Sequence, residues 1–385
     1  MTPRTAKSSC MSTLVSRASP ERMMIMISSA YVHVPFCASI CAYCDFTRWR
    51  YRPQLCARWL CRLREEASAK LKEPLKTLYI GGGTPSALDR DQLEQLLEIF
   101  DPYRAQLEEY TMEANPESLS AEKIAIIRRH GVNRISLGVQ SFDPALLQRM
   151  KRGHDAAMVS RCVRDLIEAG IINISADLIY GLPDQDMEKW KADLHQVLQL
   201  PFQHLSLYSL TVEEHSLFGV QGVKQASDEL EYAMYAYAID ELKKHGFTQY
   251  EIANFAKAGA RSKHNQVYWR YENFHGIGCG ASGKEDWGRY DNTRSLQEYL
   301  ERGPCAQEIA LDAQEQMFEA LMMGLRLREG ISLQQFEARF HARIEERFPT
   351  AMAQHLGKDL FIEEGYLRVS EEGKFVLNDI LVDFL

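Results

Sequence analysis

The feature that most constrains this chain is a repeated alternation of short β-branched or aromatic runs with longer helical segments, starting at residue 30. Six runs have the composition of strands: residues 31–34, 77–80, 110–113, 134–138, 174–179 and 205–210. Gly131, Gly170 and Gly246 each directly follow a helical segment, as C-terminal capping glycines do. Because strands joined by crossover helices pair in parallel, the pattern predicts a series of βα units.

Six such units before residue 211 predict an α/β fold built on a partial or near-complete (βα) barrel. A doubly wound open sheet is the alternative, and periodicity alone does not choose between the two. The helical segments expected between the strands are residues 57–70, 91–100, 121–130, 156–169, 187–198 and 228–245. In a parallel barrel the chemistry lies at the carboxyl ends of the strands. The residues that end each strand are therefore the first candidates for a site.

The alternation stops near residue 250, and the chain then changes character twice. Residues 250–292 are rich in Gly, Asn, Tyr and Trp and predict irregular structure with short strands. Residues 303–385 predict helices over 313–327, 333–341 and 352–361, then a hairpin over 365–377. We therefore expect a barrel domain over residues 30–302 and a small α+β, winged-helix-like domain over residues 303–385. Residues 1–29 are interpreted as a disordered extension or an early start codon.

Charge and cysteine content exclude several classes of protein. The 385 residues carry a formal net charge of −8, which argues against bulk electrostatic binding of nucleic acid. Residues 359–385 hold seven acids against two bases, so a winged-helix regulator that contacts phosphates is disfavoured. No apolar run is long enough to span a membrane. The nine cysteines are an odd number and do not form a secreted disulfide framework. We expect a cytoplasmic protein.

Three of the nine cysteines lie within eight residues, directly after the first predicted strand. Cys37, Cys41 and Cys44 have C-x3-C-x2-C spacing. A structural zinc site needs four protein ligands, and no nearby Cys or His has the spacing to complete one. A 4Fe–4S cluster is normally held by four thiolates. Three thiolates therefore leave one iron open to a ligand that is not part of the protein.

Polar and glycine residues follow the next strands in the same way. The run GGGTP at residues 81–85 follows the second strand, and glycines let the backbone approach a ligand closely. Glu113, Gln140 and Asp177 end three successive strands. A single polar residue at a strand end is usually only solvated. Three of them at one barrel mouth indicate a ligand site.

The cysteine spacing, with an aromatic residue before Cys44, resembles the radical S-adenosylmethionine (SAM) superfamily. The resemblance implies a (βα) barrel and a 4Fe–4S cluster held by Cys37, Cys41 and Cys44, whose open iron is chelated by SAM. It also implies SAM contacts at nine positions of this sequence: Tyr31, Tyr43, Gly82, Gly83, Thr84, Glu113, Gln140, Arg152 and Asp177. Such a cluster needs an electron donor, which the sequence does not name.

Longer motifs narrow the resemblance to the oxygen-independent coproporphyrinogen III oxidase group. They are YVHVPFC at residues 31–37, EANP at 113–116, SLGVQSF at 136–142, RGH at 152–154 and DLIYGLP at 177–183. The oxidases carry a fourth cysteine where this chain has Phe46, and they have a longer segment before the first strand. Both departures count against oxidative decarboxylation, and the chain is more similar to the heme-chaperone branch of the group.

That branch carries H-N-x-x-Y-W, which this chain has at residues 264–269. The resemblance implies that heme is held there. His264 is the candidate axial ligand, because imidazole is the commonest protein ligand of heme iron, and Tyr268 and Trp269 would give apolar surface beside it. The thiols of Cys279 and Cys305 are the rival ligands. The leading hypothesis is a carrier that transfers heme to an acceptor hemoprotein. The alternative is a radical SAM oxidoreductase acting on coproporphyrinogen III or a related tetrapyrrole. No catalytic residue is assigned, and the oligomeric state is left open.

Overall fold

The computed structural model describes residues 27–72 and 74–385, so most of the predicted N-terminal extension lies outside the described residues. A nine-stranded sheet has the order β11-β1-β4-β5-β6-β7-β8-β10-β9. All six predicted strands are present in it: β1 (Ser29–Val34), β4 (Thr77–Gly82), β5 (Glu109–Ala114), β6 (Arg134–Gln140), β7 (Asn173–Tyr180) and β8 (His204–Ser209). Each of these six pairs in parallel with the next.

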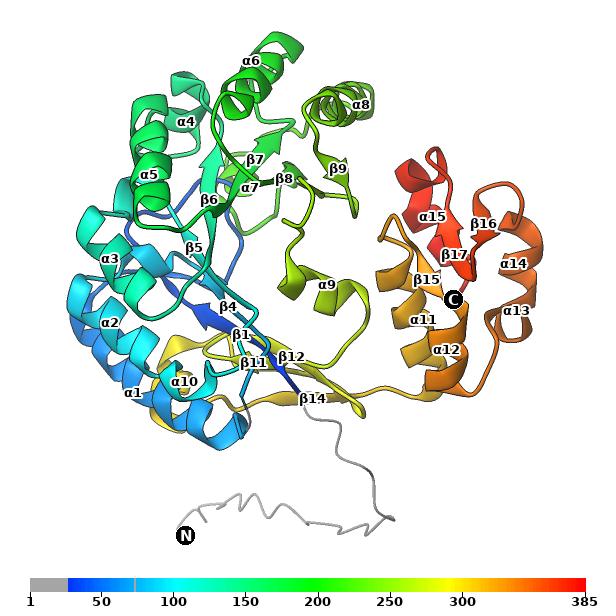
Figure 1. Ribbon diagram of the computed structural model, residues 1–385, viewed down its shortest axis with the longest axis horizontal. Helices are drawn as coiled ribbons and strands as arrows, with labels where there is room; N and C mark the ends of the chain where they lie inside the picture. Colours follow the sequence, from blue (N-terminus) through cyan, green and yellow to red (C-terminus); the bar gives the residue numbers. More distant parts are fainter. Residues whose placement is uncertain (1–26, 73) are drawn as a thin grey trace, which may run out of the picture.

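The strand order confirms the partial barrel rather than the doubly wound sheet. The six parallel strands follow one another in chain order, whereas a doubly wound sheet reverses its order at a switch point. The crossover helices cover the convex side of the arc (Figure 1). They are α1 (Pro53–Lys70), α2 (Arg90–Glu98), α3 (Ala121–Arg129), α5 (Ala156–Glu168), α6 (Met187–Leu198) and α8 (Asp228–Lys244). Within the described residues the two end strands do not pair, so the barrel stays open.

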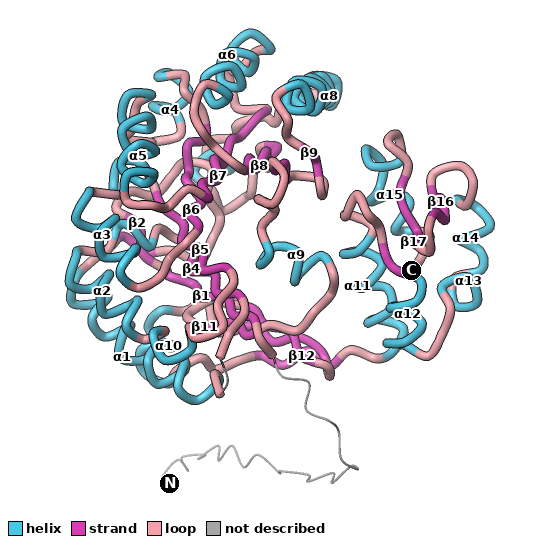
Figure 2. Tube along the Cα trace, in the orientation of Figure 1, coloured by secondary structure: helices cyan, strands magenta, loops and turns pink. Residues whose placement is uncertain are grey.

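Residues 250–292 supply strands to both ends of the sheet and one unexpected helix. β11 (His275–Ile277) runs parallel to β1, and β10 (Asn254–Ala256) pairs antiparallel with β8 and with β9 (Thr248–Gln249). The helix α9 (Lys263–Trp269) lies on the concave side of the arc (Figures 1 and 2). The sequence predicted irregular structure there, because a seven-residue helix has too few turns to show a clear period.

The remaining elements of this domain are short. They are β2 (Phe36–Cys37), β3 (Trp49–Arg50), α4 (Pro144–Arg149), α7 (Leu217–Val220), β12 (Ser282–Glu285), β13 (Gly288–Asp291), α10 (Leu296–Arg302) and β14 (Gln307–Ala310), with 3-10 turns η1 (Pro85–Ala87), η2 (Asp101–Tyr103) and η3 (Pro116–Ser118). β12, β13 and β14 form a separate antiparallel sheet.

Alternation along the strands separates an apolar outer layer from a polar lumen. On β4 the side chains of Leu78 and Ile80 are fully buried in the core beneath the helices. Tyr79, which lies between them, points inward and donates a hydrogen bond to Glu113 on β5. Successive side chains of a strand point to opposite faces. The strands thus bury apolar residues on one side and present polar residues to the lumen.

The C-terminal domain contains helices and a three-stranded sheet, in the order β15-β17-β16. Its elements are α11 (Ala313–Gly324), β15 (Ile331–Ser332), α12 (Leu333–Phe340), α13 (Ile344–Arg347), α14 (Pro349–His355), β16 (Leu360–Glu363), β17 (Tyr366–Val369), η4 (Gly373–Val376) and α15 (Leu377–Val382). No helix in the described part of the chain has the length and apolar character that a membrane crossing needs.

The predicted hairpin of this domain is wrong in its pairing. β17 pairs with the preceding strand β16, while residues 373–382 form η4 and α15 instead of a strand. Glu364 and Gly365 have φ of 51° and 79°, so these two residues make the tight turn rather than starting a strand. The predicted helix 352–361 also ends early, at His355, because Gly357 adopts φ of 83°.

Candidate functional site

The three cysteines of the triplet open onto one cavity at the carboxyl end of the parallel strands. The cavity has a volume of about 800 Å³. Its walls include all nine residues at predicted SAM contact positions: Tyr31, Tyr43, Gly82, Gly83, Thr84, Glu113, Gln140, Arg152 and Asp177. The curvature of the sheet therefore brings residues that are up to 146 positions apart in the sequence to a single site. Asp177 lies within β7 (Asn173–Tyr180), not at its end as the sequence predicted.

The cysteine loop is closed at its base by backbone pairing. β2 and β3 pair in parallel, and the amide of Tyr51 donates to the carbonyl of Cys37 at 2.8 Å. Cys37 is buried, whereas Cys41 and Cys44 are half-buried. Burial raises the pKa of the Cys37 thiol to about 12. The thiol is therefore protonated at neutral pH, and binding to iron has to displace that proton.

The arrangement of the three thiols fits a cluster better than a single ion. In the described ranges 27–72 and 74–385, no three His, Cys, Asp or Glu side chains gather closely enough to hold one metal ion. A 4Fe–4S cluster takes one thiolate per iron, so its ligands surround a larger body. Three cysteines on one loop, all facing the same cavity, meet that requirement.

The glycine turn after β4 lies directly against the start of the cysteine loop. Gly83 donates its amide to the carbonyl of Val34 at 2.8 Å, and Thr84 donates to Phe36 at the same distance. A Cβ on Gly83 would lie 2.7 Å from both carbonyl oxygens, and Gly82 has φ of 105° with the His33 ring 2.5 Å from its virtual Cβ. Only glycine fits these close approaches without moving the loop.

Two half-buried carboxylates line the lumen side of the cavity. Glu113 accepts hydrogen bonds from the Tyr79 hydroxyl at 2.8 Å and from the amide of Gly82 at 3.0 Å. Burial raises the pKa of Glu113 to about 7. Asp177 accepts a hydrogen bond from the Ser136 hydroxyl at 3.0 Å, and burial raises its pKa to about 6. Both groups can ionise when a cationic ligand enters the cavity.

Gln140 and Arg152 complete the wall next to the cysteines. Gln140 has φ of 65° at an irregularity of β6, and the following loop is held by Asp193, which accepts from the amide of Phe142 at 2.6 Å. Arg152 places Nη1 3.7 Å from the Sγ of Cys41 and donates from Nη2 to the carbonyl of Gly138 at 2.6 Å. A cation thus lies beside one predicted cluster thiolate.

Three residues of the H-N-x-x-Y-W motif lie in different surroundings. Tyr268 lines the main cavity. His264 is fully buried behind it, with Nε2 2.7 Å from the Tyr268 hydroxyl and Nδ1 2.9 Å from the Thr77 hydroxyl. Burial lowers the pKa of His264 to about 3. Trp269 lines a different cavity, of about 480 Å³, between α9 and the C-terminal domain. The two rival cysteines, Cys279 and Cys305, do not line the main cavity.

Sequence reasoning missed several residues of the main cavity. His33 lies two positions after Tyr31 on β1, so both side chains point inward. The Tyr31 hydroxyl pairs with Nδ1 of His33 at 2.9 Å, and Nε2 donates to the carbonyl of Thr47 at 2.7 Å. Tyr208, Phe274 and Arg294 also line the cavity. Strand alternation could have found His33 and Tyr208, whereas Phe274 and Arg294 come from loops without a pattern.

Comparisons with known proteins found relatives over most of the chain. Residues 31–197 match the Radical SAM superfamily, and residues 311–376 match the HemN C-terminal domain. The heme chaperone HemW of Lactococcus lactis is 38% identical, and the alignment covers 93% of this chain and 97% of that protein. HemW of Escherichia coli is 32% identical, with 93% and 98% covered.

A solved structure shows the same fold. Coproporphyrinogen III oxidase (HemN) from Escherichia coli, a radical SAM enzyme, is similar with a TM-score of 0.80. The superposition covers 92% of this chain and 89% of that chain, at 21% sequence identity. At this identity the likeness shows the fold alone. The barrel and the C-terminal domain therefore both have a counterpart in that structure.

Proposed function

This chain belongs to the HemW family of the radical SAM superfamily, and we propose that it is a cytoplasmic heme chaperone. It binds heme, delivers it to an acceptor hemoprotein and carries a 4Fe–4S cluster with SAM. The observation that carries this proposal is the similarity to HemW chains over nearly the whole length of both proteins. The cavity at the strand ends supports it, because it holds every predicted cluster and SAM position.

The chain's own residues supply a distinct function at each side of the cavity. Cys37, Cys41 and Cys44 hold the cluster, and the glycine turn lets the ligand approach the backbone. Glu113 pairs with a cationic group of SAM, and Asp177 accepts hydrogen bonds from it. When bound, the cluster and SAM together supply one-electron chemistry, for which an electron-donor protein is required.

We place the heme in the same cavity, next to Tyr268, which is the residue of the H-N-x-x-Y-W motif that lines it. Tyr268 and Phe274 lie edge to face, with ring centroids 4.6 Å apart, and give an apolar surface of the kind a porphyrin ring covers. Arg294 lines the same cavity and offers a cation to a propionate. His264 reaches the heme iron only after its Nε2 leaves the Tyr268 hydroxyl.

The fold similarity to a coproporphyrinogen III oxidase keeps an enzymatic function as the second candidate. Phe46 stands where the oxidases have a cysteine, lines the cavity and is 65% exposed. An exposed phenyl ring cannot replace a thiol in ligation or redox chemistry. We therefore propose that the chain does not decarboxylate coproporphyrinogen.

One anaerobic preparation tests both candidates. The full chain is reconstituted with iron and sulfide, titrated with hemin and, in parallel, incubated with coproporphyrinogen III, SAM and a reductant. The proposal expects four irons per chain, a saturable Soret band and no vinyl product, and it expects the Cys37→Ala, Cys41→Ala, Cys44→Ala triple variant to lose the cluster. Vinyl product would favour the oxidase, and a normal cluster in the triple variant would contradict the ligand assignment.

A further inference from the structure

A run of arginines follows the third cysteine of the predicted cluster loop. Residues 46–64 hold six arginines and no acidic residue, although the whole chain has a net charge of −8. Within the described part of the chain only one of the six, Arg62, lies in an ion pair, with Glu65. Arg50 and Arg52 are both exposed. This segment is therefore a local positive surface on a negatively charged protein.

Backbone pairing fixes these arginines next to the cluster loop. Arg50 of β3 lies opposite Cys37 of β2 in the register of the two strands. The side chain of Arg48 donates to the carbonyl of Cys44 and to that of Phe46, whose ring is 65% exposed. We call four neighbouring residues the arginine patch: Phe46, Arg48, Arg50 and Arg52. The patch thus lies beside two of the three predicted cluster ligands.

The position of Arg52 does not serve the stability of α1. Arg52 is the N-cap residue of this helix, its side chain makes no capping hydrogen bond, and the first turn holds no acidic residue. A cation near the N-terminus of a helix is unfavourable, because the helix dipole is positive there. The five other crossover helices begin with an Asp or Ser whose side chain accepts from a backbone amide. The charge of Arg52 therefore points to a role outside the helix.

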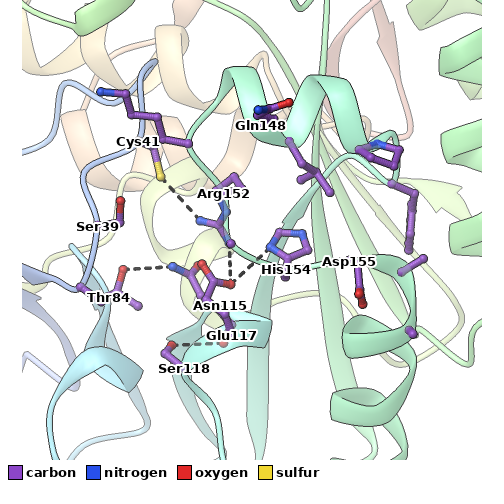
Figure 3. A pocket seen from close by; sticks show the side chains of 18 residues that line it. Ser39, Cys41, Thr84, Asn115, Glu117, Ser118, Gln148, Arg152, His154 and Asp155 are labelled. Carbon is purple, nitrogen blue, oxygen red and sulfur yellow. Dashed lines mark hydrogen bonds and ion pairs between the residues drawn. The ribbon is translucent and has the colours of Figure 1, made fainter.

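A second approach to the predicted cluster has no comparable excess of charge. A cavity of about 670 Å³ reaches Cys41 from the side of α4 and α5. Figure 3 shows that Arg152 in this cavity is turned toward Cys41 and Glu117. Apart from one histidine, the charged side chains that line the cavity are two acids and two bases: Glu117, Asp155, Lys151 and Arg152. Of the two surfaces, the arginine patch is the one that attracts an anionic partner.

We propose that the arginine patch is the docking surface for a small acidic electron-transfer protein, which supplies the electron that the cluster needs. This inference rests on the proposed function, because it requires the cluster at Cys37, Cys41 and Cys44. The donor loses one electron, which passes to the oxidised cluster, and no atom is transferred. Complementary charge steers such a partner and speeds its association. The exposed ring of Phe46 adds apolar contact of the kind that protein interfaces use.

The charge distribution favours a small acidic protein over an extended anionic surface. At physiological ionic strength charges are screened beyond about 8 Å, so a partner that covers only the patch meets its arginines and little else. A membrane or a nucleic acid would also approach other parts of a chain whose net charge is −8, and these repel it. A transient complex of small area suits a donor that has to leave after each electron.

The test measures how fast a reduced acidic flavodoxin, used as the probe, reduces the cluster of the anaerobically reconstituted full chain. Stopped-flow absorbance gives the second-order rate constant, which should fall in the wild type as salt is added. The double variant Arg50→Glu, Arg52→Glu should react about tenfold more slowly at low salt and lose most of the salt dependence. The double variant Arg50→Lys, Arg52→Lys keeps the charge and should keep the wild-type behaviour.

The matched control is the double variant Arg128→Glu, Lys243→Glu, which makes the same change of net charge elsewhere. Both residues are exposed and lie in the last turns of α3 and α8, just before the following strands begin. They are therefore at the opposite end of the sheet from the cysteine loop, and the control should keep the wild-type rate. Reduced methyl viologen, a small cation that needs no docking surface, should reduce the cluster of every variant at least as fast as that of the wild type.

Iron and sulfide analysis comes first and separates two failures. A wild type without a cluster would overturn the proposed function and this inference with it. Full clusters with equal flavodoxin rates in the wild type and in Arg50→Glu, Arg52→Glu would overturn the docking surface alone. If that variant holds no cluster, Arg50→Gln, Arg52→Gln decides, because an unchanged rate and salt dependence there contradict the proposal.

Sedimentation with vesicles of anionic lipid tests the other class of partner. The proposal expects no binding of the wild type to these vesicles at physiological salt. Binding that is lost in Arg50→Glu, Arg52→Glu, together with an unchanged flavodoxin rate, would overturn the proposal and assign the patch to a membrane surface.

Discussion

The half-buried carboxyl group of Glu113 links the stability of the fold to ligand binding. Its pKa of about 7 lies above the usual 4.5 because the carboxyl group is buried. The folded state therefore binds the proton more tightly than the unfolded state does. The stability that this gives is complete below pH about 4.5 and is lost as pH rises to about 7. A cationic ligand beside the carboxylate restores it, which couples SAM binding to ionisation.

We predict that Glu113→Gln is more stable than the wild type at pH 8, by on the order of 1–3 kcal/mol, and equal to it at pH 4.5. The amide can still accept from Gly82 and donate to Tyr79. The same variant binds SAM about 10- to 150-fold more weakly, since a charge-assisted bond is lost. Thermal unfolding at both pH values and calorimetric titration with SAM measure the two effects. Equal melting temperatures at pH 8 would show that the buried carboxylate costs nothing.

The pair of His264 and Tyr268 gives a second prediction at this scale. Because the Tyr268 hydroxyl occupies Nε2 of His264, Tyr268→Phe frees that nitrogen and keeps the ring. We expect tighter heme binding and a shifted Soret band in Tyr268→Phe, and a loss of about tenfold or more in affinity in His264→Ala. Titration with hemin measures both. If Tyr268→Phe behaves as the wild type and His264→Ala also binds normally, His264 is not the axial ligand.

Among the helices and strands, the sequence predicts those that follow from a local pattern and misses those that depend on contacts between distant residues. The six strands and their crossover helices follow from periodicity and capping glycines. The helix α9 does not, because it begins where Glu109 of β5 accepts hydrogen bonds from the amides of Lys263 and His264. Those partners are more than 150 residues apart in the sequence. The sequence also missed the pairing of β16 with β17. That pairing depends on the turn at Gly365, and a sequence pattern does not report the φ angle that makes the turn.

The contact between the glycine turn and the cysteine loop leads to a prediction for these elements. Gly83→Ala puts a methyl group 2.7 Å from the carbonyl oxygens of Val34 and Phe36. We expect a loss of about 1–3 kcal/mol of stability and a severalfold fall in iron content after reconstitution. Gly153→Ala is the control, because its new Cβ meets only Glu117, at 4.0 Å. Full iron content in Gly83→Ala would show that the loop forms the cluster site without this contact.

In the whole molecule, Tyr271 is one of several contacts between the barrel domain and the C-terminal domain, beside the bridge of Glu251 with Leu327 and the hydrogen bond from the Arg328 amide to the Tyr250 carbonyl. Tyr271 follows α9 and is 4% exposed within the core of the C-terminal domain. Its hydroxyl donates to Glu319 on α11 at 2.8 Å, and Arg289 on β13 lies 3.1 Å from the same carboxylate. These contacts connect the segment that carries the H-N-x-x-Y-W motif to the C-terminal domain.

We predict that Tyr271→Ala costs about 3–5 kcal/mol and separates the unfolding of the two domains. Scanning calorimetry of the wild type should show one main transition, and that of the variant should show two. Tyr271→Phe keeps the packing and loses only the hydrogen bond, so it costs about 1 kcal/mol. A single transition in Tyr271→Ala would indicate that other contacts couple the domains.

Hemin titration of the anaerobically reconstituted full chain shows whether this molecule carries heme. The Soret absorbance is followed as hemin is added, and an apo-hemoprotein is then supplied as acceptor. We predict saturation at one heme per chain, followed by transfer at a rate that rises with acceptor concentration, because delivery takes place in a complex. Absence of a saturable Soret band, or release at a rate independent of the acceptor, would contradict it.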